Sequence, residues 1–347
     1  MQYGYTEQLA SPLRGRALEE LKALLARTGL TYAPGIQHTA LVRAPDGGIA
    51  AAASLEGDVI KCVACDPAHQ GEDLTAAVLT TLRRKALEEG RRRLFLYTKP
   101  ENVPLFSGLG FYEVARAGEA ALMENRRGGF AAWAASVRAP GAAGRTGALV
   151  MNCNPMTLGH RYLAEQAAAR CDFLYILIVS EDKSAVPAAD RLALVRETLA
   201  GMPHTAIAET GAYLISSATF PDYFLKEKSR SGQVWTELDA AVFCRLAGLL
   251  GITCRFVGTE PFCPVTASYN RTLAQILPRH GIALAELPRL ERDGTAISAT
   301  AVRDLVGAGR WKEIRPLVPP PVYRWFASGE NRARFLARSA KLSEEQN

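Results

Sequence analysis

The sequence predicts an α/β protein made of two domains. The chain has 347 residues, and at roughly 100–200 residues per domain this length favours two domains. Hydrophobic residues make up 48% of the chain and charged residues 22%, a balance typical of chains that bury a full core. Short apolar stretches alternate with amphipathic ones along most of the chain, which is the pattern of strands connected by helices.

The first region, up to about residue 125, contains both kinds of element. The spacing of its apolar residues predicts helices over 18–27 and 73–89 and a short helix over 102–109. Strands are expected over 39–43, 48–53, 58–65 and 93–98, with a Pro-Asp-Gly-Gly turn between the first two.

A boundary between the two regions is expected over residues 126–147, which are rich in Gly, Ala and Arg. Pro140 and Gly141 interrupt this stretch, and residues 130–137 are expected to form a short connecting helix. We therefore predict a first domain at residues 1–127, a linker at 128–146 and a second domain at 147–347.

The second region begins with a regular alternation of strands and helices. Strands are expected over 147–152 and 173–180, and helices over 160–170 and 191–200. Because this alternation is typical of right-handed βαβ units, we expect a parallel sheet, with ligands bound beyond the carboxyl ends of its strands.

Charge and composition argue against several classes of protein. The 41 Lys and Arg residues exceed the 35 Asp and Glu residues by only six, so we expect no nucleic-acid partner. We expect the run of arginines from Arg91 to Arg93 to be exposed to solvent. No stretch approaches the ~18 apolar residues of a membrane span, and the first twenty residues hold no apolar leader. We therefore expect no membrane partner and a cytoplasmic location. The seven scattered cysteines, including the lone pair Cys62 and Cys65, predict free thiols and no metal site.

The turn after the first strand of the second region carries the strongest functional signal. An apolar strand is followed by Asn152 and Asn154, and Thr157-Leu-Gly-His160 then opens a helix. A helix start offers free N–H groups and a positive dipole end, Gly159 allows close approach to the backbone, and the Thr and His side chains add donors. This donor set predicts a site for a phosphoryl group.

A second donor set lies about 140 residues further along the chain. The segment Ile297-Ser-Ala-Thr-Ala-Val-Arg303 opens another helix. The hydroxyl groups of Ser298 and Thr300, the N–H groups of the helix and the guanidinium of Arg303 form a convergent anion site.

The first region also contains a possible anion site. A strand, a turn at Gln70 and Gly71, and an amphipathic helix follow one another, and together with residues 102–114 they resemble the GNAT acetyltransferase superfamily over residues 1–125. The resemblance implies an acyl-CoA-like site at Gln70 and Gly71. Because the carboxylates of Glu72 and Asp73 are unfavourable beside a phosphate, a fold retained as a docking or structural module is the alternative.

The T-x-G-H and I-S-x-T-x-V-R pair resembles the HIGH-type nucleotidyltransferase superfamily, and further stretches at 216–226, 235–239, 255–263 and 265–270 are similar to the citrate lyase ligase family. This resemblance implies a GNAT-like α/β domain followed by a Rossmann-like α/β/α domain with a parallel sheet. It also implies an enzyme that uses ATP, with Mg²⁺, to convert acetate to acetyl-AMP. The enzyme would then acetylate the prosthetic-group thiol of the citrate lyase acyl carrier protein, releasing AMP and pyrophosphate.

The resemblance assigns roles to particular residues of this chain. Thr157, His160 and Arg303 are the expected catalytic residues, the first two at the α-phosphate. The expected ATP-binding set is Asn152, Asn154, Thr157, Gly159, His160, Arg191, Gly258, Thr259, Glu260, Ser298, Thr300 and Arg303.

Two alternative functions remain at this point. One is an adenylyltransferase that moves AMP onto a phosphate-ended acceptor, and the other is a sensor of nucleotide or acyl-CoA. Lys183 is either a phosphate-binding cation or a solvated loop lysine, and Cys153 is expected to pack rather than to act as a nucleophile.

Overall fold

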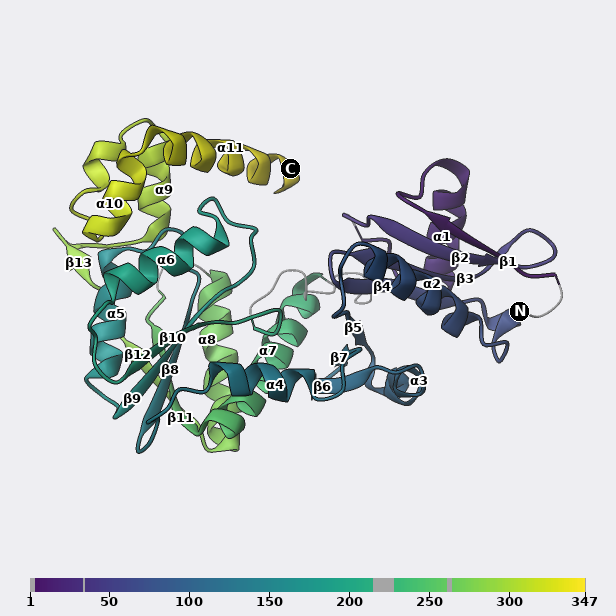
Figure 1. Cartoon of the computed structure of the whole chain (residues 1–347), viewed down its shortest axis with the longest axis horizontal. Coiled ribbons are helices and arrows are strands. Elements are labelled where there is room, and N and C mark those ends of the chain that lie inside the picture. The colour runs from purple at the N-terminus through teal and green to yellow at the C-terminus, as the bar shows by residue number, and fades with distance from the viewer. Residues whose placement is uncertain (1–3, 34, 215–227, 261–263, 347) are drawn as a thin grey trace. The chain divides into compact units, whose positions relative to one another are not determined.

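The computed structural model describes residues 4–33, 35–214, 228–260 and 264–346. Contacts divide the chain into two compact units (Figure 1). Unit 1 comprises Met1–Phe130 and Ala218–Val242, and unit 2 comprises Ala131–Ser217 and Phe243–Asn347. Each unit combines a sheet with helices, so the predicted α/β class is confirmed.

Unit 1 is built on a seven-stranded mixed sheet. Its order is β1-β2-β3-β4-β5-β7-β6, and neighbouring strands are antiparallel except for β4 and β5. The elements predicted up to residue 109 are present within three residues at each end, whereas β1 and β7 were not predicted. The elements of this part are β1 (Thr6–Ala10), α1 (Gly15–Arg27), β2 (His38–Arg43), β3 (Ile49–Glu56), β4 (Val59–Cys65), α2 (Leu74–Glu88), β5 (Phe95–Thr98), α3 (Val103–Gly108), β6 (Tyr112–Ala117) and β7 (Ala120–Glu124).

The core of unit 1 lies between the sheet and its helices. Leu21, Leu24 and Leu25 of α1 are fully buried, and their spacing places them on one face of the helix. The inner strand β3 carries a buried run of alanines from Ala50 to Ala53 and contacts both α1 and α2. Small side chains on this strand allow the helices to pack closely against the sheet.

A bulge in β4 separates the two cysteines of the C-x-x-C pair. The register between β3 and β4 shifts between Ala52 and Ser54, and Cys62 adopts a φ of +53°. Cys62 is buried, whereas Cys65 is half-buried. The predicted free thiols are confirmed for the six cysteines in the described residues, and Cys263 lies outside them.

Unit 2 contains the predicted parallel sheet. Its five strands are all parallel in the order β10-β9-β8-β11-β12. The chain order reverses between β8 and β11, which is where α/β sheets bind ligands beyond the strand ends. The strands are β8 (Thr146–Met151), β9 (Phe173–Ile178), β10 (Thr205–Glu209), β11 (Ile252–Gly258) and β12 (Ala283–Leu287).

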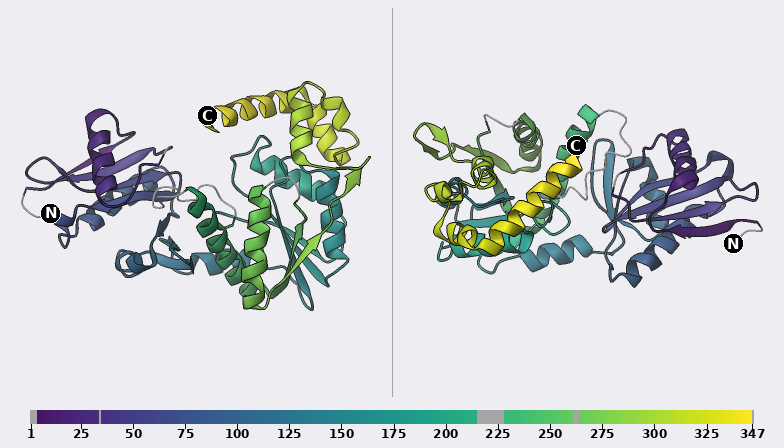
Figure 2. Two further views of the ribbon diagram at one scale, coloured as in Figure 1. Left: turned by 180° about the vertical axis from the view of Figure 1, so that it is seen from behind. Right: turned by 90° about the horizontal axis from the view of Figure 1, so that it is seen from above.

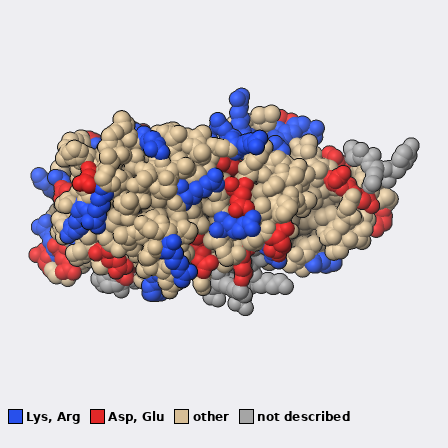
Figure 3. Space-filling view, turned by 90° about the horizontal axis from the view of Figure 1, so that it is seen from below, with Lys and Arg blue, Asp and Glu red and all other residues tan. Residues whose placement is uncertain are grey.

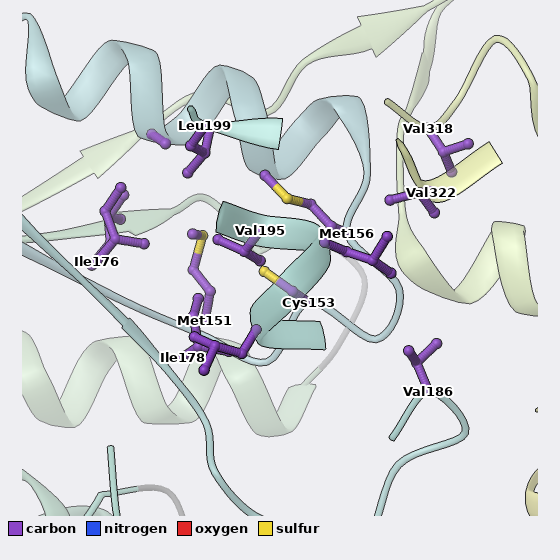
Figure 4. Close-up of a cluster of buried hydrophobic side chains, with 14 of the residues drawn as sticks. Met151, Cys153, Met156, Ile176, Ile178, Val186, Val195, Leu199, Val318 and Val322 are labelled. Carbon is purple, nitrogen blue, oxygen red and sulfur yellow. The ribbon is translucent and has the colours of Figure 1, made fainter. Parts of the chain in front are cut away.

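Helices cover both faces of this sheet (Figure 1). On one face, Met151, Ile176 and Ile178 pack in a cluster with Val195 and Leu199 of α6 (Figure 4). The other face is covered by α8 and by the C-terminal part of α7. The helices that precede or flank the sheet are α4 (Gly129–Val137), α5 (Leu158–Ala168), α6 (Ala188–Thr198), α7 (Lys228–Leu250) and α8 (Pro264–Ile276).

Three further helices pack together beside α6 (Figure 2). They are α9 (Ala299–Gly307), α10 (Pro320–Ala327) and α11 (Gly329–Gln346), and a small hairpin of β13 (Glu291–Arg292) and β14 (Thr295–Ala296) precedes them. The ring of Phe326 in α10 contacts the ring of Phe335 in α11, and this contact joins the two helices. Of these three helices, only the start of α9 was predicted from the sequence.

The surface carries charges of both signs. On the face drawn in Figure 3, Lys and Arg side chains are interspersed with Asp and Glu side chains, so positive charge does not cover that face continuously. Among the described residues, no helix combines the length and apolar character needed to cross a membrane.

Candidate active site

The T-x-G-H turn connects β8 to α5 at the carboxyl edge of the parallel sheet. Thr157 is the N-cap residue of α5 and is buried, and its hydroxyl accepts the N–H of His160 at 3.3 Å. His160 returns the interaction, because its Nδ1 accepts the N–H of Thr157 at 3.1 Å. This reciprocal capping box fixes both side chains at the start of the helix.

The protonation state of His160 follows from these contacts. Burial, reinforced by the positive charge of Arg289, lowers the pKa of His160 to about 4, so the ring is neutral at pH 7. Since Nδ1 accepts a backbone N–H, the ring proton is assigned to Nε2. His160 is therefore held as a neutral hydrogen-bond donor through Nε2.

The second donor set lies directly against the first. A Cβ atom at Gly159 would lie 3.0 Å from the carbonyl oxygen of Ile297, so glycine is required for this close approach. Arg303 reaches across as well, because its Nη1 donates to the carbonyl oxygen of Asn154 at 2.8 Å and its Nη2 donates to the Thr300 hydroxyl at 2.9 Å. The fold thus brings together two segments that are about 140 residues apart in the chain.

The start of α9 resembles the start of α5 in its capping. Ser298 is the N-cap residue, and its hydroxyl accepts the N–H of Ala301 at 3.1 Å. Partial burial removes the Arg303 guanidinium from some of its water, and this lowers the pKa of Arg303. A partly desolvated charge interacts more strongly with an anion than a solvated one does.

The carboxyl end of β11 supplies Gly258, Thr259 and Glu260. A Cβ atom at Gly258 would lie 4.0 Å from Leu163 of α5, and Glu260 forms an ion pair with Arg289. Arg289 also donates from Nε to the carbonyl oxygen of Thr259 at 2.7 Å. Arg289 was not predicted as a site residue, although its place two residues after β12, at the same edge of the sheet, is a detectable signal.

Arg191, which the sequence predicts to bind ATP, contacts backbone carbonyl groups in the structure. Its side chain is fully buried, and its guanidinium donates to the carbonyl oxygens of Asn152 and Val179, each at 2.8 Å. It also donates to the carbonyl oxygens of Val186, at 3.2 Å, and Glu181. This geometry favours a structural role for Arg191, ordering the loops after β8 and β9, over direct contact with ATP.

The loop after β9 is also held from the side of α11. Arg338 donates from Nε to the carbonyl oxygen of Ser184 at 3.0 Å and from Nη2 to that of Asp182 at 2.5 Å. Asn152 and Asn154 contact the same loop, through the Ser184 hydroxyl at 3.3 Å and the Val186 N–H at 2.9 Å. Both asparagines therefore shape the turn through their side chains.

Lys183 lies in this loop with an exposed side chain, 3.8 Å from a carboxylate oxygen of Glu181. Cys153 packs in the core of unit 2, as predicted from the sequence. Its thiol lies in the apolar cluster beside Met156 and Val195 (Figure 4), and burial raises the pKa of Cys153 to about 12. A thiol that stays protonated at pH 7 is a poor nucleophile.

In unit 1, Gln70 and Gly71 are exposed and lead into α2, and Gly71 has a φ of +90°. Asp73 precedes the helix in a left-handed conformation and makes no capping hydrogen bond through its side chain. The stretch at 216–226 and residues 261–263, which contributed to the family resemblance, lie outside the described residues.

The donor set at the edge of the unit 2 sheet is suited to an oxyanion. It combines a neutral imidazole, hydroxyl groups and a guanidinium at two adjacent helix starts. No group of three His, Cys, Asp or Glu side chains that could hold a metal ion occurs in the described residues. Fold and site together define an α/β protein that gathers donors where a nucleotide phosphate binds in related architectures.

Comparison with known proteins identifies the family. A profile of the citrate lyase ligase C-terminal domain matches residues 146–326. The chain is 45% identical over 276 residues to the citrate (pro-3S)-lyase ligase of Klebsiella pneumoniae, covering 77% of this chain and 80% of that protein. It is 42% identical over 284 residues to the ligase of the same name from Escherichia coli strain K12, with 79% and 80% covered. The chain belongs to the citrate lyase ligase family, and it is a ligase.

A solved structure also shows a likeness to part of the chain. It is that of a putative acyl-CoA N-acyltransferase from Klebsiella pneumoniae, with 22% identity and a TM-score of 0.28, and the match covers 35% of this chain and 95% of that one.

Proposed function

We propose that this ligase activates acetate with ATP and transfers the acetyl group to the prosthetic-group thiol of the citrate lyase acyl carrier protein. The observation that carries the proposal is the direct contact between the T-x-G-H and I-S-x-T-x-V-R segments, through Gly159 with Ile297 and Arg303 with Asn154. These contacts concentrate donors around one small region, as binding of a triphosphate requires.

In the first step, a carboxylate oxygen of acetate attacks the α-phosphorus of ATP. The bond between the α-phosphorus and the bridging oxygen breaks, and pyrophosphate leaves with the electron pair. His160 would donate its Nε2–H to an α-phosphate oxygen, since its Nδ1 is committed to Thr157. Ser298, Thr300 and Arg303 would hold the β- and γ-phosphates.

In the second step, the thiol of the carrier attacks the acetyl carbon of acetyl-AMP. The carbon–oxygen bond to AMP breaks, AMP leaves as the phosphate anion, and the thiol proton passes to solvent. Neither step uses a protein nucleophile, in agreement with the buried and protonated thiol of Cys153.

Mg²⁺ is part of this proposal as a companion of ATP. Because the described residues offer no cluster of metal ligands, the ion would bind mainly to phosphate oxygens and water. Bound there, it would neutralise negative charge on the triphosphate. We also propose that the reaction takes place in the cytoplasm.

The test is ATP–pyrophosphate exchange with the purified protein, with and without acetate. Exchange that depends on acetate is expected, because formation of acetyl-AMP is reversible and needs no carrier protein. Adenylyl transfer onto a phosphate-ended acceptor is the alternative, and exchange that requires such an acceptor and ignores acetate would overturn the proposal. ATP binding without any exchange would indicate a nucleotide sensor.

A further inference from the structure

A buried arginine on the other face of the unit 2 sheet forms no ion pair within the part of the chain that the structure describes. Arg255 lies on β11, and 2% of its surface is exposed. Its Nη2 donates to the hydroxyl of Tyr269 at 2.9 Å. Its Nε and Nη1 are buried and have no hydrogen-bond partner in the described residues. Because Nε carries one hydrogen and Nη1 carries two, three N–H donors are unsatisfied.

Two aromatic rings lie close to the guanidinium of Arg255. The guanidinium carbon lies 4.3 Å from the ring centre of Phe243 on α7 and 5.7 Å from that of Tyr269 on α8. The structure gives Arg255 no ion pair among the described residues. The nearby Cys244 does not supply a negative charge, because burial raises the pKa of its thiol to about 11.

Such an arrangement is costly unless something compensates it. A charge removed from water requires both a counter-charge and hydrogen-bond partners, and aromatic faces compensate it only in part. The other buried arginine among the described residues, Arg191, donates its hydrogen bonds to backbone carbonyl oxygens. Arg255 is therefore suited to an anion that enters from outside.

The position of Arg255 connects it to the candidate active site. It lies three residues before Gly258, the end of β11, which is a distance of about 10 Å along a strand. Tyr269, its hydrogen-bond partner, directly precedes Asn270, whose Nδ2 donates to the carbonyl oxygen of Gly258 at 3.1 Å. The guanidinium is thus next to the turn of α8 that holds the end of β11.

We propose that Arg255 binds the carboxylate of a short monocarboxylic acid, and that acetate is this ligand during adenylation. The identification of acetate rests on the proposed function. The unsatisfied N–H groups match carboxylate oxygens, and the rings of Phe243 and Tyr269 offer apolar surface for a short alkyl tail. A larger dianion such as phosphate is less suited to a site bordered by two rings.

The kinetic test compares Arg255→Met and Arg255→Lys with the unaltered protein in acetate-dependent ATP–pyrophosphate exchange. Loss of a charged hydrogen-bond donor is expected to raise the KM for acetate about tenfold or more for Arg255→Met, with the KM for ATP changed less than twofold. Arg255→Lys, which keeps the charge, is expected to recover part of the loss. Arg279→Met removes one exposed arginine charge and serves as the matched control.

A second readout does not depend on activity. Saturation-transfer NMR on the methyl protons of acetate, without ATP, is expected to show binding to the unaltered protein and to Arg279→Met but not to Arg255→Met. Thermal unfolding without acetate is expected to show equal or greater stability for Arg255→Met, because an uncompensated buried charge has been removed. Acetate is expected to raise the unfolding temperature of the unaltered protein and of Arg279→Met, but not that of Arg255→Met.

Each result supports or overturns a particular statement. An unchanged KM for acetate in Arg255→Met, or an unchanged NMR signal, would refute the role of Arg255 while leaving the proposed function standing. A marked loss of stability in Arg255→Met without ligand would show a structural arginine and would also refute it. Displacement of acetate by equimolar phosphate would show a general anion site instead. Absence of acetate-dependent exchange in the unaltered protein would instead count against the proposed function.

Discussion

Replacement of His160 by glutamine tests the central step of the proposed reaction. The imidazole is neutral, its Nδ1 is occupied by the N–H of Thr157, and one donor, Nε2–H, is left for the α-phosphate. Loss of a single preorganised donor to a transition state costs about 10²- to 10³-fold in rate, which corresponds to about 2.7–4 kcal/mol. We expect His160→Gln to slow acetate-dependent ATP–pyrophosphate exchange by that factor, with a small change in the KM for ATP.

The pH dependence of the same assay separates a neutral donor from an imidazolium. Because the pKa of His160 is lowered to about 4, the ring stays neutral from pH 5.5 to 8, and the exchange rate is expected to show no inflection from this residue. His280→Gln, an exposed histidine, is the control. An inflection between pH 6 and 7 that disappears in His160→Gln, or a variant less than tenfold slower than the unaltered protein, would refute the reasoning.

Four further predictions follow from the same geometry. Cys153→Ala is expected to keep the exchange rate within a few-fold, with a loss of about 1–2 kcal/mol in unfolding free energy from the lost packing, measured by urea denaturation. Gly159→Ala is expected to reduce exchange at least tenfold with unchanged circular dichroism, because its Cβ would lie 3.0 Å from the Ile297 carbonyl oxygen. Arg191→Met is expected to cost about 3–5 kcal/mol, seen as a lower thermal midpoint, since buried carbonyl groups lose their donors. The pKa of His160 is about 4 in the folded chain, against its ordinary value of 6.5. Between pH 6.5 and pH 4 the unfolded chain therefore binds more protons than the folded chain, and the free energy of unfolding falls as the pH decreases through this range. Between pH 7 and 4.5 this costs about 2 kcal/mol, measurable as the difference between the unaltered protein and His160→Gln.

The fold was predictable where apolar periodicity was strong. The strands around the T-x-G-H turn have uniformly apolar residues, as β9 shows with six buried positions, and such runs are typical of parallel sheets. β10 was missed because its residues are half-buried and mostly small. The bulge at Cys62 was missed because a positive φ at a non-glycine residue leaves no pattern in the sequence.

The sequence predicted that the T-x-G-H and I-S-x-T-x-V-R segments act together, and the structure brings them into contact, whereas the roles of their residues stay predictions. The residue types and spacing of Thr157, Gly159 and His160 indicate a site for a phosphoryl group. The structure brings these residues against the segment that starts at Ile297. Arg191 also follows a strand and opens a helix, but sequence position does not reveal whether a side chain points to ligand or to backbone carbonyl groups. The buried and unsatisfied state of Arg255 likewise depends on tertiary packing alone.

The hydrogen bonds from Arg338 to the loop after β9 affect the order in which the protein folds. The contact joins Arg338 to Ser184 across 154 residues of chain, so the loop closed by this contact is long and its formation is expected late. During synthesis, the sheet strands emerge from the ribosome well before α11 does. The loop beside the phosphate site therefore acquires its final support only when the last helix has been made, so an incomplete chain has the sheet but lacks a finished site.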